Sequence, residues 1–289
     1  MGHTFGWPDC LPRPVYASLA KLAPLDPWFE VYRVAPGVYA IYEPFHFEEI
    51  ISYVIHGDER AILLDTGMGV GDIRAEAENI TKLPLVAVNT HWHYDHIAGN
   101  YQFEEVWAYD NDFEVRKIEE GVSNAEMGYR MGPDWVCRPI PGGFGSDNYY
   151  VRPSRVTHRL RHLEEIDLGG RTLVVHHTPG HSPGGLCLYD RQERLLFSGD
   201  VYYPGTLYCN LERSNFPDYL ASLEYLAAML DRVSQVAPSH NEPLVPPSEI
   251  AAALDGFRKI ADGTAAYTVR NGVRNYRFER FLVEFPDGD

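Results

Sequence analysis

Short runs of apolar residues, separated by polar breaks, mark the first part of the chain. Four runs typical of strands occur before residue 67: VYRV, GVYAIYE, ISYVIHG and AILLDTG. The residues at 57–59, GDE, supply a turn between the last two. Apolar positions at helical spacing follow over 73–80, and then comes the apolar run LPLVAV. The pattern predicts strands first and then alternating strands and helices.

The second half of the chain repeats this layout. RTLVVHHTPGHS predicts a strand and a tight loop, and LCLYD with RLLFSGD predicts a hairpin that turns at 191–193. The segment 217–233 is strongly amphipathic, with Pro217 suited to a first helical turn. VAPSH then predicts a short strand, and a further helix is expected over about 247–261. In the C-terminal segment VRNYRFERFLVEF, apolar and polar residues alternate, which predicts an edge strand.

These elements predict a single α/β domain over 31–289, preceded by an N-terminal extension at 1–30. A chain of 289 residues that is 45% hydrophobic can bury a substantial core. The segment from about 120 to 163 is rich in Gly, Pro, Arg and aromatic residues and shows no clean periodicity. We therefore expect a loop or cap insertion there.

Charge and cysteine content narrow the class of protein. The formal net charge of −16 disfavours nucleic acid and anionic membrane surfaces as partners. Membrane-length apolar runs and a standard signal sequence are not apparent. The four cysteines are widely spaced without a CxxC pair, which favours free thiols in a reducing compartment. A cytoplasmic protein acting on a small molecule is the expectation.

The chemistry begins at NTHWHYDHIAGN, residues 89–100, directly after LPLVAV. His91 and His93 are two apart, so they share one side of an extended segment. Asp95 and His96 require the chain to turn and then point at a second position. A single metal ion with all four ligands would be cramped, whereas two ions completed by distant ligands would not. Sites of this kind tend to lie where strands end in open α/β sheets.

Three distant residues are candidates to complete the two sites. His181 lies in a loop constrained by Pro and Gly, TPGHSPGG. Asp200 ends the strand LLFSGD, where a carboxylate can bridge two cations, and His240 closes VAPSH. Each alone would be an ordinary loop residue, but together with the first motif they indicate a metal centre.

These motifs resemble those of the metallo-β-lactamase superfamily. HxHxDH is matched at 91–96, and the flanks DTG at 65–67, TPGHSPGG and SGD at 198–200 match too, over roughly 31–260. The resemblance implies an αββα sandwich of two mixed sheets flanked by helices, with the site at one edge. It also implies one metal ion on His91, His93 and His181, a second on Asp95, His96 and His240, and a bridging Asp200.

The implied centre is that of a dinuclear metal hydrolase. Two divalent ions, zinc foremost and iron, manganese or cobalt as alternatives, can hold a bridging hydroxide at neutral pH and polarise the attacked carbonyl or phosphoryl group. Asp95 is expected to guide a proton toward the leaving group. Asp65 either orients a ligand from outside the centre or stabilises a turn.

The substrate is less directly encoded. Tyr203, three residues after Asp200, resembles a tyrosine that N-acyl homoserine lactone lactonases place beside their metals, where a phenol can stabilise an oxyanion. A lactone is therefore the expected substrate, although Tyr203 packed at a strand end would look the same. Phosphotriesters or phosphodiesters and, as in glyoxalase II, thioesters are alternatives. A mononuclear iron oxidoreductase similar to persulfide dioxygenases, or a non-catalytic metal-binding scaffold, would be a different class.

Aromatic residues are the candidates for a substrate pocket. Contacts with substrate are expected from Phe45, Phe47, Tyr202 and Tyr208. The insertion adds Tyr129, Trp135, Tyr149 and Tyr150, which either line the pocket or form a core beneath a long loop. That insertion suits a lid, a pocket wall or a homodimer interface. Six histidines without a motif position are expected to be surface or packing residues: His3, His56, His158, His162, His176 and His177.

Overall fold

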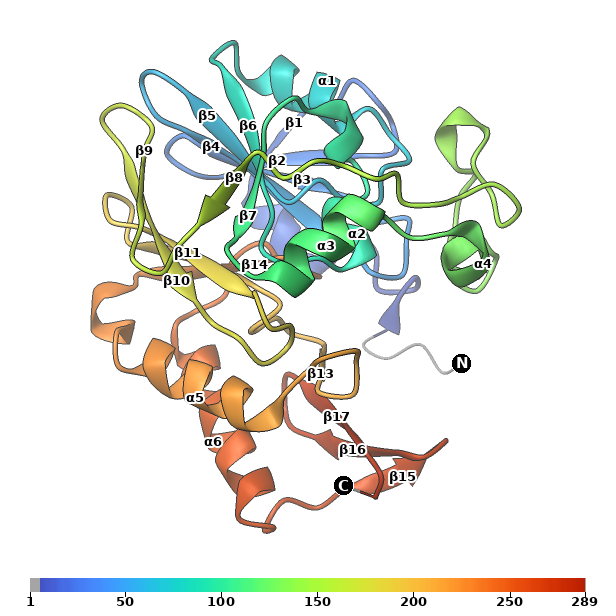
Figure 1. Ribbon diagram of the computed structural model, residues 1–289, viewed down its shortest axis with the longest axis vertical. Helices are drawn as coiled ribbons and strands as arrows, with labels where there is room; N and C mark the ends of the chain where they lie inside the picture. Colours follow the sequence, from blue (N-terminus) through green and yellow to red (C-terminus); the bar gives the residue numbers. More distant parts are fainter. Residues whose placement is uncertain (1–5, 289) are drawn as a thin grey trace.

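The computed structural model describes residues 6–288 and consists of two large sheets, a small third sheet and flanking helices (Figure 1). His3 lies outside the described residues. The first sheet has eight strands in sequence order: β1 (Ala20–Leu22), β2 (Glu30–Ala35), β3 (Val38–Tyr42), β4 (Ile51–His56), β5 (Ala61–Leu64), β6 (Leu85–Val88), β7 (Val106–Tyr109) and β8 (His158–Leu160). Its β1–β5 half is antiparallel and its β5–β8 half is parallel.

The second sheet has the order β14-β12-β11-β10-β9 and is also mixed, because β12 and β14 are parallel while the other pairs are antiparallel. Its strands are β9 (Glu165–Asp167), β10 (Thr172–His177), β11 (Leu186–Asp190), β12 (Leu195–Gly199) and β14 (Gln235–Pro238). The predicted 191–193 hairpin is confirmed as β11–β12.

Three hydrophobic clusters define the layers. The central cluster joins the two sheets through residues such as Tyr53 and Ile62 from the first and Leu188 and Phe197 from the second. A second cluster packs the other face of the first sheet under α1 (Ile73–Ile80), α2 (Tyr94–Ile97) and α3 (Asp112–Glu120). A third packs the second sheet under α5 (Phe216–Ala227) and α6 (Ser248–Ala261). This arrangement confirms the predicted αββα sandwich.

The C-terminal segment differs from the prediction. It forms a hairpin of β16 (Val273–Arg277) and β17 (Leu282–Pro286), because a turn at 278–281 interrupts the apparent single strand. With β13 (Thr206–Tyr208) and β15 (Thr268–Arg270), this hairpin builds the third sheet, at the end of the molecule opposite α1 (Figure 1). The amphipathic segment 217–233 is also shorter than predicted, since α5 ends at Ala227 and a 3-10 turn follows at Leu230–Arg232.

Two further segments bear on the site. Residues 20–22, within the segment expected as an extension, pair with β2 as strand β1. The segment 120–163 holds α4 (Asn124–Met127), short 3-10 turns and β8; the part around α4 projects to one side of the sandwich, while β8 lies in the first sheet (Figure 1). An isolated bridge between His46 and Val136 attaches it to the loop before β4. In residues 6–288, no helix has the length and apolar character needed to cross a membrane.

Candidate metal centre

The first motif lies where β6 ends and the chain turns into α2. His93 is the last extended residue before this helix, with φ −60° and ψ 148°, so Asp95 and His96 follow on helical backbone. Asn89 fixes the turn: its amide donates to the His96 carbonyl at 3.1 Å and accepts from Asn100 at 2.8 Å. The change from extended to helical backbone is what separates the two pairs of side chains, as the sequence predicted.

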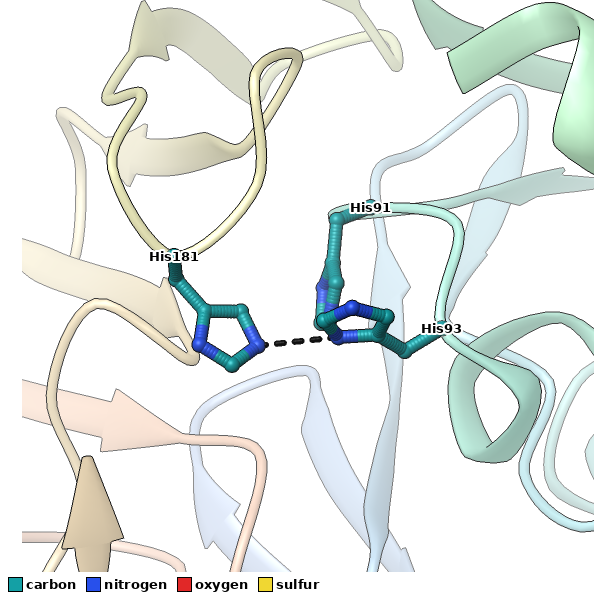
Figure 2. A group of neighbouring side chains, drawn as sticks. All are labelled: His91, His93 and His181. Atoms are coloured by element: carbon teal, nitrogen blue, oxygen red, sulfur yellow. Dashed lines mark hydrogen bonds between the residues drawn. The ribbon is translucent and has the colours of Figure 1, made fainter. Parts of the chain in front are cut away.

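One group of imidazoles converges from two loops. His91 and His93 come from the loop after β6 and His181 from the loop after β10, and Figure 2 shows the three rings facing one another. The His93 Nδ1 atom lies 2.8 Å from His91 Nε2 and 2.9 Å from His181 Nε2. Burial lowers the pKa of His91 and His93 well below the usual value and that of His181 to about 4. Neutral rings with lone pairs facing a common point are what a metal ion requires.

A second group joins Asp95 and His96 to His240 at the end of β14. The ring atom His240 Nε2 lies 3.6 Å from Asp95 Oδ2, and His96 Nε2 lies 3.6 Å from the same oxygen. Among the described residues, this group and the group of His91, His93 and His181 are each arranged so that they could hold a metal ion. All seven residues named from the sequence therefore meet at one edge of the sandwich.

Asp200 stands between the two groups. Its Oδ2 atom is 3.5 Å from His181 Nε2, while its Oδ1 atom is 3.1 Å from His240 Nε2 and 3.4 Å from His96 Nε2. The Oδ2 atom also lies 3.2 Å from His240 Nε2, so the carboxylate contacts both groups, which is the placement expected of a bridging carboxylate. Burial opposes ionisation of Asp200, but His240 and His96 outweigh it and hold the pKa of that carboxyl well below its usual range.

Contacts behind the rings fix their orientation. Asp65 accepts from His96 Nδ1 at 2.8 Å and from the Thr90 backbone amide at 2.7 Å. The other ring nitrogens of His181 and His240 face the carbonyls of Tyr208 and Glu48, at 3.3 and 2.7 Å. Of the two roles left open by the sequence, these contacts support the first: Asp65 holds a ligand ring from outside the centre, and it also fixes the Thr90 amide beside His91.

The residues present fit divalent cations. His96 Nε2 and Asp200 Oδ1 are buried without a hydrogen-bond partner among the described residues. Burial would lower the pKa of His96, but Asp65, Asp200 and Asp95 outweigh burial and raise it well above the usual value. Buried polar atoms of this kind are costly unless a cation or proton satisfies them. Five imidazoles and two carboxylates are also a donor set that zinc and other transition metals accept.

A cavity of about 290 Å³ opens onto this centre. Tyr203 and Tyr208, two of the residues expected to contact substrate, line it, and so does Trp135 from the insertion. The remaining wall was not named from the sequence and consists of Glu48, Trp92, Tyr94, Met127, Arg130, Leu211 and Glu212. Trp92 and Tyr94 lie inside the HWHYDH motif, so their position in the sequence was a usable signal. Arg130 lies in a segment without periodicity and offered none.

Arg130 and its neighbours form a polar wall of the cavity. The guanidinium donates to Glu48 at 3.0 Å and to the Tyr94 hydroxyl at 2.7 Å, and Tyr94 donates to Glu48 in turn. The Arg130 Cζ atom lies 4.5 Å from the centroid of the Tyr94 ring and 4.8 Å from that of Trp135. These contacts tie the insertion to the residues beside the metal centre.

Tyr203 is placed close to the centre, yet its hydroxyl is engaged elsewhere. Its ring centroid lies 4.6 Å from that of His240. The phenol donates its hydrogen to the backbone carbonyl of Thr206. The single hydroxyl proton is therefore committed to the third sheet and not to a substrate oxyanion.

Three predicted pocket residues are not among those that line this cavity. Tyr202 is fully buried against α6 and donates to Glu249, because its side chain points to the opposite side of the chain from Tyr203. Phe45 packs against Trp28 and beneath Arg138, and Phe47 packs edge-on against Trp135. Phe47 therefore supports the cavity wall from behind, while Phe45 belongs to the helix-side core.

The aromatic residues of the insertion divide between the two roles considered. Trp135 lines the cavity, whereas Tyr149 is buried and donates to the Met68 carbonyl at 3.0 Å. Tyr129 and Tyr150 are exposed.

Among the histidines without a motif position, His176 is buried, with Nδ1 2.7 Å from the Tyr225 hydroxyl, and the exposed His158 faces Glu164. Packing and surface roles are consistent with these positions.

Comparisons with known proteins agree with this geometry. The family model described as metallo-beta-lactamase superfamily matches residues 50–266. The acyl-coenzyme A thioesterase MBLAC2 of Gallus gallus is 33% identical over 226 residues, which cover 74% of this chain and 80% of the relative. Its Homo sapiens counterpart is 31% identical, covering 74% and 81%. Among solved structures, BLEG-1 B3 metallo-beta-lactamase superposes with a TM-score of 0.53 and 26% identity, covering 72% of this chain and 96% of that one.

Proposed function

The chain belongs to the metallo-beta-lactamase superfamily of metal-dependent hydrolases, and from that premise we propose that it hydrolyses thioesters of the acyl-coenzyme A class. The relatives named above are thioesterases, and they match over most of their length. They favour the thioester alternative over the lactone predicted from Tyr203. The dinuclear centre, with zinc foremost, the cytoplasmic location and the homodimer remain predictions.

The observation that carries the proposal is the engagement of Tyr203 with Thr206. A lactone or ester releases an alkoxide, which needs a proton donor. A thioester releases a thiolate, whose conjugate acid has a pKa of about 8.5, so it departs with little help. A cavity in which the phenol expected to hydrogen-bond to the leaving oxygen, that of Tyr203, is already engaged with Thr206 suits a thiolate leaving group better.

The side chains around the centre have distinct tasks in this reaction. Divalent cations held by the two groups would activate water and polarise the thioester carbonyl. Asp65, Thr90 and the Glu48 carbonyl hold the imidazoles in place. The apolar wall of Trp92, Met127, Trp135 and Leu211 offers a dry surface for the acyl chain or the carrier arm.

A substrate panel on protein of measured metal content tests this proposal. Acyl-coenzyme A esters, acyl homoserine lactones and aryl phosphodiesters would be compared. Thiol release from the thioesters is followed with a colorimetric reagent, lactone opening by the acid that it produces, and phosphodiester cleavage by the phenolate that it releases. We expect kcat/KM to be highest for the thioesters and to be abolished in Asp200→Ala. Hydrolysis of lactones without hydrolysis of thioesters would contradict the proposal and restore the lactone interpretation. Oxygen consumption with one iron bound would instead indicate an oxidoreductase.

Lactone hydrolysis is the second candidate, favoured by one observation. The Tyr203 ring lies directly against His240 in the same cavity, close to where the lactonase tyrosine is expected. A rotation of the phenol away from Thr206 would free its hydroxyl. The panel above separates the two candidates, because only the lactone reaction requires that hydroxyl.

A further inference from the structure

Three cations gather around one aromatic ring beside the metal cavity. Arg116 and Lys117 come from α3 and Arg213 from the loop between β13 and α5. Their charged groups lie 5.5, 5.4 and 5.6 Å from the centroid of the Phe113 ring. We call these three residues the cationic ledge. Cations gathered around one ring repel one another, and a bound anion would offset this repulsion.

The ledge is only partly neutralised by the protein. Lys117 forms an ion pair with Glu212 at 2.7 Å. Arg116 and Arg213 form no ion pair with any residue among 6–288, although the chain carries a net charge of −16 and acidic partners are plentiful. Both arginines are exposed. Two guanidinium groups are therefore available to an anion from solution.

The backbone of Arg213 is itself unusual. Its φ of 65° lies in the left-handed region that favours glycine. The turn that holds it is closed by a hydrogen bond from the Ser214 amide to the Leu211 carbonyl at 3.0 Å. An arginine at a position better suited to glycine points to a use for its side chain.

A hollow of about 380 Å³ has Arg116 of α3 and Arg213 in its wall, whereas Lys117 is not among its lining residues. Its wall consists of Asn111, Asp112, Phe113, Arg116, Pro183 and Arg213. The N-terminus of α3 lies here, and its helix dipole favours anions, although the Asn111 side chain already accepts from the Phe113 and Glu114 amides. Asp112 is the one carboxylate in this wall, and it is paired with Arg159 at 2.8 Å. The net character of the hollow is cationic.

The ledge adjoins the metal cavity through a line of ring contacts. Trp92, which lines that cavity, lies 4.7 Å from His93 and 5.7 Å from Phe113, measured between ring centroids. Lys117 Nζ is 4.8 Å from the centroid of the Trp92 ring. Glu212 also lines the metal cavity, immediately before Arg213 in the chain. A ligand anchored on the ledge can therefore extend a flexible arm past Trp92 to the metals.

We propose that the cationic ledge binds the phosphate groups of the coenzyme A carrier and so positions the thioester at the metal centre. This inference rests on the proposed thioesterase function. Arginine is suited to it, because its planar guanidinium binds two phosphate oxygens at once. Binding at the ledge would contribute to KM, whereas bond cleavage at the metals would set kcat.

The test compares two substrates that carry the same acyl group. Hexanoyl-coenzyme A carries phosphates, and S-hexanoyl-N-acetylcysteamine does not. In the double variant Arg116→Gln with Arg213→Gln, we expect KM for hexanoyl-coenzyme A to rise about tenfold with kcat nearly unchanged. The kcat/KM for the short thioester should stay as in wild type. Arg270→Gln, at an exposed position on β15 in the third sheet, is the matched control and should change neither value.

The outcomes separate this inference from the proposed function. If the double variant changed the kinetics of both thioesters equally, or of neither, the proposed phosphate binding at the cationic ledge would be wrong. The proposed thioesterase function would be unaffected. Absence of activity on both thioesters in the metal-loaded wild type would overturn the function. In that case calorimetry with adenosine 3′,5′-bisphosphate tests whether the cationic ledge binds phosphates. Binding by the wild type that is lost in the double variant supports the ledge. Binding that is equal in the two proteins, or absent from the wild type, refutes it.

Discussion

Asp65 is not one of the seven candidate metal ligands, but it orients His96, which is one of them. Its carboxylate is fully buried and holds both His96 and the Thr90 amide. Its own φ of 60° lies in the left-handed region, which Asp and Asn tolerate better than most residues. The DTG motif thus combines a backbone requirement with the orientation of a ligand.

Asp65→Asn is expected to weaken metal binding while preserving the fold. Asparagine tolerates the same backbone, but its amide offers one acceptor where the carboxylate offers two. Loss of such an outer contact typically lowers metal affinity by about 10- to 100-fold. Competition with a chromogenic chelator would measure the affinity, and Asp231→Asn, at an exposed position, serves as control. Unchanged affinity in the Asp65 variant would show that His96 needs no such support.

Tyr203→Phe distinguishes a structural phenol from a catalytic one. The variant leaves the Thr206 carbonyl without its donor, so the free energy of unfolding should fall by about 1 kcal/mol. Thioester kcat should change little, because the hydroxyl is not directed at the substrate. Urea unfolding and thioesterase kinetics measure the two effects. A large loss of kcat at unchanged stability would return Tyr203 to a direct catalytic role.

At the scale of elements, α3 and the loop after β10 are joined by one buried carboxylate. Glu114 on α3 accepts from the Gly184 amide at 2.8 Å, three residues after His181. The loop is packed so closely that a Cβ on Gly184 would lie 2.1 Å from the Glu114 side chain. Burial raises the pKa of Glu114 from 4.5 to about 7. The protonated form is therefore the one that the fold favours.

This shift predicts a pH-dependent contribution to stability. A carboxyl whose pKa is higher in the folded than in the unfolded chain stabilises the fold fully below pH 4.5 and loses that contribution as pH rises toward about 7. Relative to Glu114→Gln, the wild type should lose about 2 kcal/mol between pH 5 and pH 8. Urea unfolding of both proteins at the two pH values measures this difference, with Glu120→Gln, at an exposed position on the same helix, as control. A constant difference between wild type and Glu114→Gln would contradict it.

At the scale of the whole molecule, the candidate metal centre joins the two halves of the sandwich. His91, His93, Asp95 and His96 follow a strand of the first sheet, whereas His181, Asp200 and His240 follow strands of the second. The sheets also share one large apolar core. Bound cations would thus link two layers that already pack together.

Removal of metal is accordingly expected to destabilise the whole fold and not one loop. A ligand that binds only the folded state at about 100 times its Kd adds about 2.7 kcal/mol of stability. Treatment with a chelator should lower Tm in a single cooperative transition, and zinc should restore it. Chelator already saturated with zinc is the control. An unchanged Tm in protein shown to be metal-free would contradict a structural link through the centre.

Much of the fold and of the site could be predicted because the signals are local. Strand and helix periodicity identified most elements. The HxHxDH motif, together with His181, Asp200 and His240, identified residues that lie close together in the structure. Sequence periodicity failed to predict the hairpin of β16 and β17, because a chain reversal interrupts the alternation of apolar and polar residues. It also failed to predict which way a side chain points, because that depends on packing. Tyr202 and Tyr203 are adjacent, yet only Tyr203 faces the cavity.

Local sequence encodes the first four residues of the candidate centre, because ligand spacing within a strand-to-helix turn is a property of a few neighbouring residues. Tertiary structure alone decided the pocket. Glu48, Tyr94 and Arg130 meet only when the insertion folds back on the loop before β4. The cationic ledge likewise joins α3 to residue 213, about one hundred positions later in the chain. Contacts between segments so distant follow from the packing of the layers, which no local pattern encodes.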